Sequence, residues 1–463
     1  MPELKKINEI SQLYFLGIGG IGMSALARYF HFHGKKVSGY DRTETALTRQ
    51  LEEEGIEVHY EDNPALIPAD TELVIYTPAI PASLQELAWI KQQGWTMMKR
   101  SEALGLITES SFTIAVAGTH GKTTISTMIA HLLRHSGFGC NAFLGGISVN
   151  YNSNFWSNER NLSVVEADEY DRSFLKLSPD MAVITSMDAD HLDIYGSTES
   201  VEQAFIDFAG RLKADGTLLV KKGLKREGEL KAERKYTYSL EDPSADIRPV
   251  EIDTANAVYT FKVSVRGKIW GPFVLPMGGI HNVENMTAAI GIASQLGIEE
   301  EKLKDAVSSF RGVKRRFEYI IREERVVMID DYAHHPEELK ALIGSARKLY
   351  PQSFCTLVFQ PHLFSRTKDL AAAFAESLDE ADEVLLLPIY PARELPVPGV
   401  SSKLIADKMF RAKVKEVSKE ELPSLLARDV QTKKLHLIIT AGAGDIDRLV
   451  DPVKQSIQNS LQA

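Results

Sequence analysis

Residues 113–134 read TIAVAGTHGKTTISTMIAHLLR, and this stretch decides the fold. Its apolar beginning predicts a buried strand that stops at Gly118. From Lys122 onward, apolar residues recur at the spacing of a helix. A strand, a glycine turn and a helix N-terminus form an anion site, because free backbone N–H groups and the positive end of the helix dipole point at one spot. We therefore expect Lys122 to reach the outer phosphates of a nucleotide and the Thr123 hydroxyl to bind Mg²⁺.

This glycine turn is a shortened form of the common phosphate-binding loop. The usual spacing requires a glycine at the position that Val116 holds here. A tight turn before a surface helix is the structural alternative, and GKTT after a buried strand argues against it. The predicted phosphate-binding residues are Gly118, Thr119, His120, Gly121, Lys122, Thr123 and Thr124.

The composition is that of a globular protein with room for about three domains. The chain has 463 residues, of which 44% are apolar and 25% are charged. Its two cysteines, Cys140 and Cys355, lie far apart in the sequence and predict a reducing compartment. The net charge is −10, from 53 basic and 63 acidic residues, and basic residues do not cluster as in nucleic-acid-binding proteins. Without a signal-peptide pattern or a membrane-spanning segment, we expect a cytoplasmic protein with no nucleic-acid or membrane partner.

A second glycine loop, GIGGIG at residues 17–22, lies near the N-terminus. It follows an apolar strand and precedes a helical pattern, as the dinucleotide-binding fingerprint requires. Asp41 ends the next predicted strand, about 20 residues further on, where an NAD site places its ribose-binding carboxylate. The glycines predict a phosphate or diphosphate without naming the nucleoside, so an NAD-dependent oxidoreductase domain stays open here. The loop TPAIP, which begins at Thr77, follows another strand and is expected to line the same ligand site.

Acidic residues follow two predicted strands of the central segment. Glu166 ends one strand, and His191 lies in the acidic run DADHLD after the other. If both strands flank the strand before Gly118, Glu166 and His191 converge beside Thr123. A carboxylate, an imidazole, a hydroxyl, phosphate oxygens and water can complete an octahedral Mg²⁺ shell. Further along, GGIHN opens a helix, where Asn282 is expected either to read an adenine edge or to cap the helix.

The last segment repeats a pattern of strands that end in polar residues. DDYAHHP, QPHLFSRT, YPARE and AGAGD each follow a predicted strand. Four parallel strands with polar residues at one edge predict a second open α/β sheet that faces the nucleotide. Arg315 and Arg316 stand at the start of this segment. An arginine at a domain junction can stabilise a transferring phosphoryl group, although basic residues at such a boundary are more often simply solvated.

Taken together, the motifs resemble those of a known family. GTHGKTT, EADEYD, DADHLD, the HN of GGIHN, RRFE, DDYAHHP and QPHLFSRT stand in the order typical of Mur ligases, and the resemblance covers nearly the whole chain. GIGGIGMS, DDYAHHP and YPARE are most similar to the members that join L-alanine to UDP-N-acetylmuramate. The resemblance implies an α/β fold with three domains. These are a Rossmann-like UDP-sugar domain (1–109), a central P-loop ATPase-type mixed sheet (110–312), and a C-terminal Rossmann-like open sheet (313–463) for the amino acid and ATP.

The resemblance also implies roles for individual residues. ATP is assigned to residues 118–124 with Asn282, Arg316 and Asp331. Mg²⁺ is assigned to Thr123, Glu166 and His191, and catalysis to Lys122, His191 and Arg316. The UDP-sugar, in place of NAD, is assigned to Gly17, Gly19, Gly20, Ile21, Gly22, Asp41, Thr77 and His120. The amino acid is assigned to Tyr332, His334 and Arg366.

The reaction that the resemblance implies is ATP- and Mg²⁺-dependent amide formation in peptidoglycan precursor synthesis. The γ-phosphoryl group of ATP passes to the muramyl carboxylate, and the alanine amine then attacks the acyl phosphate. Alternatives are a related ligase that attaches a preformed peptide to the same sugar acid, an NAD-dependent oxidoreductase fused to an NTPase, and a non-catalytic nucleotide switch. Two departures from the family pattern stand out. Leu363 replaces a basic residue that would give the alanine carboxylate a second partner, and Ala333 replaces a glycine, which a negative φ would tolerate.

Overall fold

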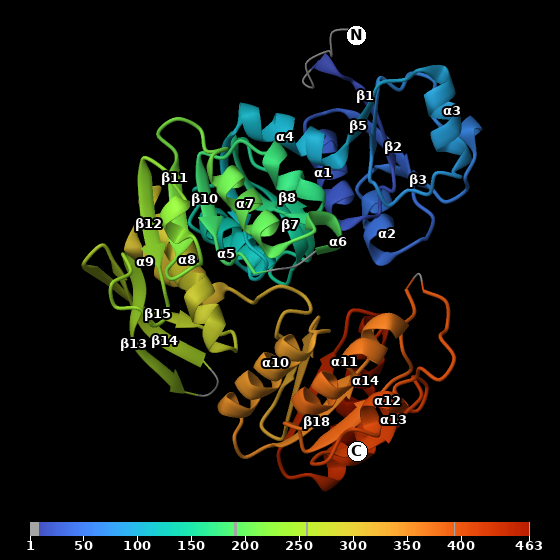
Figure 1. Ribbon diagram of the computed structural model, residues 1–463, viewed down its shortest axis with the longest axis vertical. Coiled ribbons are helices and arrows are strands. Elements are labelled where there is room, and N and C mark those ends of the chain that lie inside the picture. Colours follow the sequence, from blue (N-terminus) through green and yellow to red (C-terminus); the bar gives the residue numbers. More distant parts are fainter. Residues whose placement is uncertain (1–8, 189–191, 256–257, 393, 463) are drawn as a thin grey trace. The chain divides into compact units, whose positions relative to one another are not determined.

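The computed structural model describes residues 9–188, 192–255, 258–392 and 394–462 (Figure 1). The chain forms two compact units. The first comprises Met1–Ile252, Phe261–Val274 and Val283–Phe310, and the second comprises Asp253–Thr260, Leu275–Asn282 and Arg311–Ala463. Within the described residues, the strands form three sheets.

The N-terminal sheet has five parallel strands in the order β3-β2-β1-β4-β5. They are β1 (Gln12–Leu16), β2 (Lys36–Tyr40), β3 (Glu57–His59), β4 (Leu73–Tyr76) and β5 (Met97–Lys99). Its helices are α1 (Ile21–Phe32), α2 (Ala46–Glu53), α3 (Gln85–Gln93) and α4 (Arg100–Ser110), with a 3₁₀ turn η2 (Pro64–Leu66). The strand order reverses at β1, so the loops after β1 and β4 border one crevice at the carboxyl edge.

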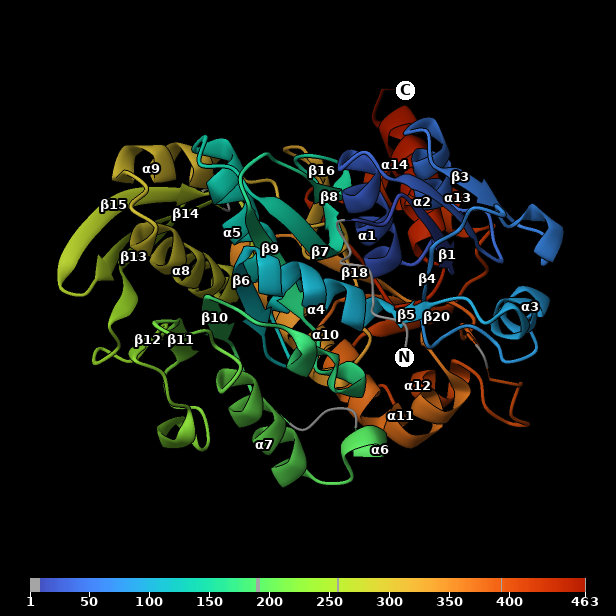
Figure 2. The same cartoon turned by 90° about the horizontal axis from the view of Figure 1, so that it is seen from above.

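The central sheet has ten strands in the order β15-β14-β13-β12-β11-β10-β6-β9-β7-β8. They are β6 (Phe112–Ala117), β7 (Asn141–Ser148), β8 (Ser153–Trp156), β9 (Leu162–Ala167), β10 (Met181–Ile184), β11 (Thr217–Lys221), β12 (Arg234–Tyr238), β13 (Ile247–Ala255), β14 (Val258–Val265) and β15 (Lys268–Leu275). Its helical elements are α5 (Lys122–His135), η3 (Tyr170–Lys176), α6 (Leu192–Tyr195), α7 (Thr198–Ala209), η4 (Glu227–Glu229), α8 (Ile280–Gln295) and α9 (Glu300–Ser309), seen from a second side in Figure 2.

Strand β6 lies near the middle of the central sheet, between β9 and β10, and runs parallel to both. Four of its residues, from Ile114 to Ala117, are fully buried, as expected for a strand with neighbours on both sides and both faces covered. In the register of β6 and β9, Val116 lies opposite Glu166. The carboxyl ends of the two strands therefore open at the same edge, where the phosphate loop begins.

The C-terminal sheet has six strands in the order β16-β17-β21-β18-β19-β20, and only β16 is antiparallel to its neighbour. They are β16 (Glu318–Arg322), β17 (Val326–Asp331), β18 (Phe354–Phe359), β19 (Glu383–Leu386), β20 (Lys413–Glu416) and β21 (His436–Ala441). Its helices are α10 (Pro336–Leu349), α11 (Phe364–Leu378), α12 (Lys403–Ala406), α13 (Leu422–Thr432) and α14 (Asp447–Gln462). The predicted α/β fold is confirmed, with an N-terminal Rossmann-like sheet, then a central mixed sheet and a C-terminal Rossmann-like sheet in the order of the chain.

Helix ends differ from the predicted ones where a distant side chain decides them. The pattern predicts a helix over residues 83–93, and α3 begins at Gln85 because Asp62 accepts hydrogen bonds from the backbone N–H groups of Gln85 (2.9 Å) and Glu86 (3.0 Å).

Among the described residues, no helix combines the length and the apolar character that a bilayer crossing needs.

Candidate functional site

The phosphate loop between β6 and α5 has a backbone that only glycine fits at two positions. Gly118 has φ +135°, and a Cβ atom there would overlap the Thr185 hydroxyl. Gly121 has φ +82° and is the N-cap of α5. Thr185 donates to the His120 carbonyl oxygen (2.5 Å), and the His120 N–H donates to Ser186 Oγ (2.9 Å). The residues that follow β10 thus hold the loop in shape, with the N-terminus of α5 directed into it.

Lys122 is held by a buried carboxylate that the motif analysis did not assign to the site. Its Nζ donates to the two carboxylate oxygens of Glu169 (2.9 and 2.7 Å) and to the Gly118 carbonyl oxygen (2.8 Å). The Glu169 side chain is 2% exposed, and its backbone carbonyl accepts from the Tyr195 hydroxyl (2.6 Å). The three ammonium protons of Lys122 thus have three acceptors, so a nucleotide phosphate has to replace one of them.

Thr123 and Glu166 are brought together, as the strand-end argument predicts. Thr123 Oγ1 lies 3.0 and 2.9 Å from the two carboxylate oxygens of Glu166, and the Gly145 N–H donates to one of these oxygens (3.0 Å). A hydroxyl beside a carboxylate is a donor set that fits Mg²⁺. Within the part of the chain that the structure describes, no group of three or more His, Cys, Asp or Glu side chains forms a metal cluster. The predicted third ligand, His191, lies outside the described residues.

The other predicted residues of the loop have different environments. Thr119 Oγ1 donates to the Asp188 carbonyl oxygen (2.9 Å), and the His120 ring is largely exposed, with Nε2 at 3.8 Å from Asp188 Oδ2. Thr124 is buried. Asn282 is 2% exposed, and its amide donates to the Gly278 carbonyl oxygen (2.7 Å) in the turn that precedes α8.

A second asparagine of α8, Asn285, lies at the phosphate loop and was missed by the sequence analysis. Its side-chain oxygen lies 3.3 Å from the point where a Cβ atom on Gly121 would stand. Asn285 follows Asn282 by three residues, so both lie on one side of α8. This helical spacing is the signal that could have identified it.

The N-terminal glycine loop packs against the carboxyl end of β2. Gly17 has φ +85°, and the Gly17 and Ile18 N–H groups both donate to the Tyr40 carbonyl oxygen (2.8 and 3.0 Å). Asp41 accepts from the Gly19 N–H through one carboxylate oxygen (2.8 Å). Gly20 is the N-cap of α1, and no side chain caps this helix N-terminus. The free N–H groups of the first turn therefore remain available for an anion.

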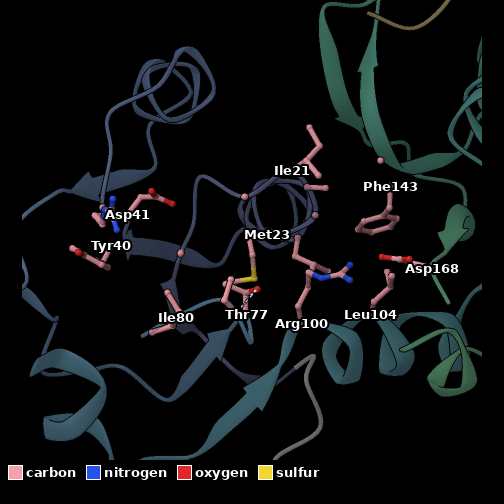
Figure 3. Close-up of a pocket in the computed structure, with 18 of the residues that line it drawn as sticks. Ile21, Met23, Tyr40, Asp41, Thr77, Ile80, Arg100, Leu104, Phe143 and Asp168 are labelled. Carbon is pink, nitrogen blue, oxygen red and sulfur yellow. Dashed lines mark hydrogen bonds between the residues drawn. The ribbon is translucent and has the colours of Figure 1, made fainter. Parts of the chain in front are cut away.

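A cavity of about 560 Å³ runs from this glycine loop to the central domain (Figure 3). Its lining includes the predicted residues Gly17, Gly20, Ile21, Gly22, Asp41, Thr77 and Glu166. It also includes Asp168 of the EADEYD motif and residues that no motif indicated, among them Arg100, Phe143 and Gly145. In Figure 3 the guanidinium group of Arg100, at the start of α4, points toward Phe143 and Asp168. One space therefore connects the N-terminal glycine loop with the carboxylate beside Thr123.

In the second unit, a left-handed turn presents Arg316. Arg315 and Phe317, on either side of it, have φ +60° and +51°. Arg315 Nε donates to Asp330 (3.2 Å), whereas Arg316 is exposed. Asp331 accepts from the Phe317 N–H (2.7 Å) and the Ala333 N–H (2.8 Å), and burial raises its pKa to about 6. The two arginines thus differ: Arg315 is tied to the sheet through Asp330, whereas the exposed Arg316 has its guanidinium carbon 5.6 Å from the centre of the Tyr332 ring.

The predicted amino-acid residues lie together at the ends of β17 and β18. The Tyr332 ring lies 5.3 Å from the His334 ring, which lies 6.2 Å from the ring of His362. Arg366 Nη1 is buried and has no hydrogen-bond partner among the described residues. Burial, with Arg366 and Arg316 nearby, lowers the pKa of His334. Ala333, between Tyr332 and His334, avoids positive φ, as its side chain requires.

A glycine loop with a lysine at the N-terminus of α5, a hydroxyl–carboxylate pair and a cavity that begins at a second glycine loop are features of a nucleotide-binding α/β protein. Three family models match successive parts of the chain: "Mur ligase family, catalytic domain" at residues 12–111, "Mur ligase middle domain" at residues 116–293, and "Mur ligase, glutamate ligase domain" at residues 315–444. The chain belongs to the Mur ligase family.

Similar proteins of known name or structure cover almost the entire chain. A UDP-N-acetylmuramate–L-alanine ligase of Flavobacterium johnsoniae is 46% identical over 98% of this chain and 100% of its own length. One from Parabacteroides distasonis is 48% identical over 98% of this chain and 99% of its own. The crystal structure of the UDP-N-acetylmuramate–alanine ligase of Thermotoga maritima, 28% identical, superposes with a TM-score of 0.83 over 97% of this chain and 99% of its own.

Proposed function

We propose that the chain is an ATP-dependent ligase that joins L-alanine to UDP-N-acetylmuramate through an acyl phosphate, in peptidoglycan precursor synthesis. The cavity from the N-terminal glycine loop to Glu166 carries this proposal, because it lets a sugar nucleotide held at α1 extend its acid toward the phosphate loop. The names of the similar proteins support the choice of both substrates. The three domains would be a UDP-sugar-binding domain at residues 1–109, an ATP-binding domain at residues 110–312, and a domain for the amino acid and ATP at residues 313–463.

The UDP-sugar would bind with its diphosphate at the N-terminus of α1. This helix has no acidic residue in its first turn and no side-chain cap, so its positive end is not compensated. Arg100 lies beside Gly22, where a Cβ atom would stand 2.9 Å from Arg100 Nη1, and adds a cation to this end of the cavity. Together with the glycine loop, Arg100 would hold the diphosphate and leave the muramyl carboxylate free to reach Glu166.

ATP would bind at the loop between β6 and α5. Lys122 would exchange a contact with Glu169 or Gly118 for a phosphate oxygen, and its charge would then stabilise the transferring phosphoryl group. Thr123 and Glu166 would hold Mg²⁺, with His191 as the third ligand that the family resemblance implies. When bound, the ion supplies positive charge next to the β- and γ-phosphates. Arg316 would add charge to the same group.

L-Alanine would bind in the second unit through Arg366 and His334. A buried guanidinium nitrogen without a partner is costly, and a substrate carboxylate would provide that partner. The low pKa of His334 keeps its ring neutral, so it can orient the substrate without repelling the ammonium group. The amine would then attack the acyl phosphate, form the amide bond and release phosphate.

We place the reaction in the cytoplasm. Cys140 and Cys355 are both free and buried, which fits a reducing compartment. The same compartment supplies ATP and nucleotide sugars.

Phosphate release tests the proposal. Release should require ATP, Mg²⁺, UDP-N-acetylmuramate and an amino acid together, and L-alanine should be preferred in a panel with glycine, serine and the peptide L-Ala-γ-D-Glu-meso-diaminopimelate. A preference for the tripeptide would replace the proposal by a peptide ligase. Phosphate release that depends on neither UDP-N-acetylmuramate nor the amino acid would favour a nucleotide switch. A change in NADH absorbance would favour an oxidoreductase.

A further inference from the structure

A buried network of hydrogen bonds joins α1 of the N-terminal domain to β8 of the central sheet. This network, the polar seam, consists of Asn154 on β8 and of Ile21, Ser24 and Arg28 on α1. Asn154, on β8, is 0% exposed. Its amide nitrogen donates to the Ile21 carbonyl oxygen (2.5 Å) and to Ser24 Oγ (3.1 Å), and its amide oxygen accepts from Arg28 Nη1 (2.5 Å). Ile21, Ser24 and Arg28 are spaced by three and four residues and share one face of α1. One side chain of the central sheet thus holds two turns of this helix.

Arg28 is held from its other side by α2 and the residue after it. It is 6% exposed, and its Nε donates to Glu54 (2.6 Å). Buried polar groups have to keep their partners, because an unpaired charge in the interior is strongly destabilising. The seam therefore admits only a narrow range of positions of α1 against β8.

Aromatic packing beside the seam gives contact area without fixing a register. The Tyr29 ring of α1 lies 5.3 Å from Phe143 and 6.3 Å from Phe155, and these two rings of the β7–β8 hairpin lie 5.2 Å apart. The main contribution of these rings is buried apolar area, which depends less sharply on a shift along the hairpin than hydrogen bonds do. The position of α1 along the hairpin is consequently set by the hydrogen bonds of Asn154.

The helix and the β7–β8 hairpin that the seam joins each carry a residue of the proposed active site. Ile21 is the first residue of α1 and lines the cavity at its phosphate-binding end. The partner strand β7 carries Gly145, whose N–H donates to Glu166, the residue that contacts Thr123. A shift of α1 along the hairpin would therefore change the distance from the sugar nucleotide to the phosphoryl group.

We propose that Asn154 is a positioning residue that sets the N-terminus of α1, and with it the UDP-sugar, in register with the phosphoryl-transfer site. The inference rests on the proposed function for its kinetic consequence. A displacement of about 1 Å between reacting groups can cost about 100-fold in rate. Asn154 is not among the residues that line the cavity, and it acts through α1, by way of the Ile21 carbonyl oxygen and the Ser24 and Arg28 side chains.

The test compares Asn154→Ala with a matched control, Asn141→Ala. Asn141 is the same residue type, 3% exposed and on the same hairpin, but its amide donates to the carbonyl oxygens of Arg160 and Leu162 and not to α1. For Asn154→Ala, we expect kcat to fall about 10- to 100-fold and ATP affinity to stay unchanged. The ratio of phosphate released to amide formed should rise above one, because a misplaced acyl phosphate meets water. The control variant should have a lower Tm than the wild type, and its ratio of phosphate released to amide formed should stay at one.

Hydrogen exchange gives a readout that needs no activity. The backbone amides of residues 21–28 should exchange faster in Asn154→Ala than in the wild type and the control. If the wild-type chain formed no amide, the proposed function would fail, whereas the exchange data would still test the seam. If Asn154→Ala does not fold, Asn154→Asp replaces it, since it keeps the bond from Arg28 and loses only the donation to Ile21 and Ser24. Unchanged exchange in either variant, or an equal rise of the phosphate ratio in the control, would overturn the proposal.

Discussion

Replacing Lys122 by alanine should have two separable effects, one on turnover and one on stability. The Lys122 ammonium group and the Glu169 carboxylate form a close ion pair (2.7 Å), with side chains that are 13% and 2% exposed. The alanine variant would leave the Glu169 charge buried without its cation. Turnover should fall because the phosphoryl group loses its cation, and stability should fall because Glu169 loses the same partner.

The size of the stability effect follows from the burial of the pair. Removing one partner of a buried ion pair costs about 3–5 kcal/mol, and the partial exposure of Lys122 places the expected loss near the lower end, about 3 kcal/mol. For a domain of about 150–250 residues, 1 kcal/mol shifts the Tm by about 2–4 °C, so the central domain should melt about 6–12 °C lower. The double variant Lys122→Ala with Glu169→Gln has no buried unpaired charge, and it should recover most of this loss.

Thermal unfolding followed by circular dichroism measures the loss of stability, and phosphate release measures the loss of turnover. Both variants should lose at least about 100-fold in turnover, since neither carries the lysine ammonium group that would contact the phosphoryl group. Binding of the UDP-sugar, measured by calorimetry, should stay close to that of the wild type. If the Tm of the double variant is as low as that of the single variant, the unpaired Glu169 charge is not the cause of the lost stability. If either variant loses UDP-sugar binding, the two nucleotide sites are not separate.

Three further predictions test the other sites. Gly19→Ala should raise the KM for the UDP-sugar about tenfold at unchanged ATP affinity, since a Cβ atom would stand 2.8 Å from Asp41 Oδ2; an equal KM would contradict the assigned loop. Arg366→Lys should raise the KM for L-alanine at least about tenfold, because a lysine cannot reproduce a two-nitrogen contact, and an unchanged KM would remove Arg366 from the site. Burial raises the pKa of Glu86 from 4.5 to about 7, so the folded chain keeps a proton that the unfolded chain releases. Stability of the N-terminal domain should then fall by at most about 3 kcal/mol as the pH rises from about 4.5 to 7, and Glu86→Gln should remove this dependence in thermal unfolding at several pH values.

The parts of the fold that sequence predicts well are those with a strong local pattern. The strand, turn and helix around Gly118 are set by a buried apolar run, a glycine turn and regular helical spacing, all of which lie within about 20 residues. Parallel strands then bring their carboxyl ends to one edge, which is why the neighbourhood of Thr123 and Glu166 follows from motif order alone.

The remaining site residues depend on contacts between distant segments. Glu169 lies in the same acidic run as Glu166, and only the three-dimensional arrangement distinguishes the carboxylate that holds Lys122 from the one that contacts Thr123. Arg100 and Asn154 belong to no motif, since each acts through its place against another element. Local sequence patterns carry no information on such pairs.

Leu363, where some relatives have a basic residue, contributes through its backbone. Its φ of +71° costs an L-residue about 1–3 kcal/mol, and hydrogen bonds hold the turn from both sides. Its N–H donates to the Tyr390 carbonyl oxygen (2.9 Å), and its carbonyl accepts from Thr367 Oγ1 (2.8 Å). This turn starts α11 and so determines where Arg366 lies, whatever side chain position 363 carries. The departure at Leu363 therefore removes a charge and leaves the placement of Arg366 intact. If Arg366 binds the alanine carboxylate as proposed, it does so without the second cation that the family resemblance implies, and a contact through both of its outer nitrogens is the reason to expect weaker alanine binding in the lysine variant.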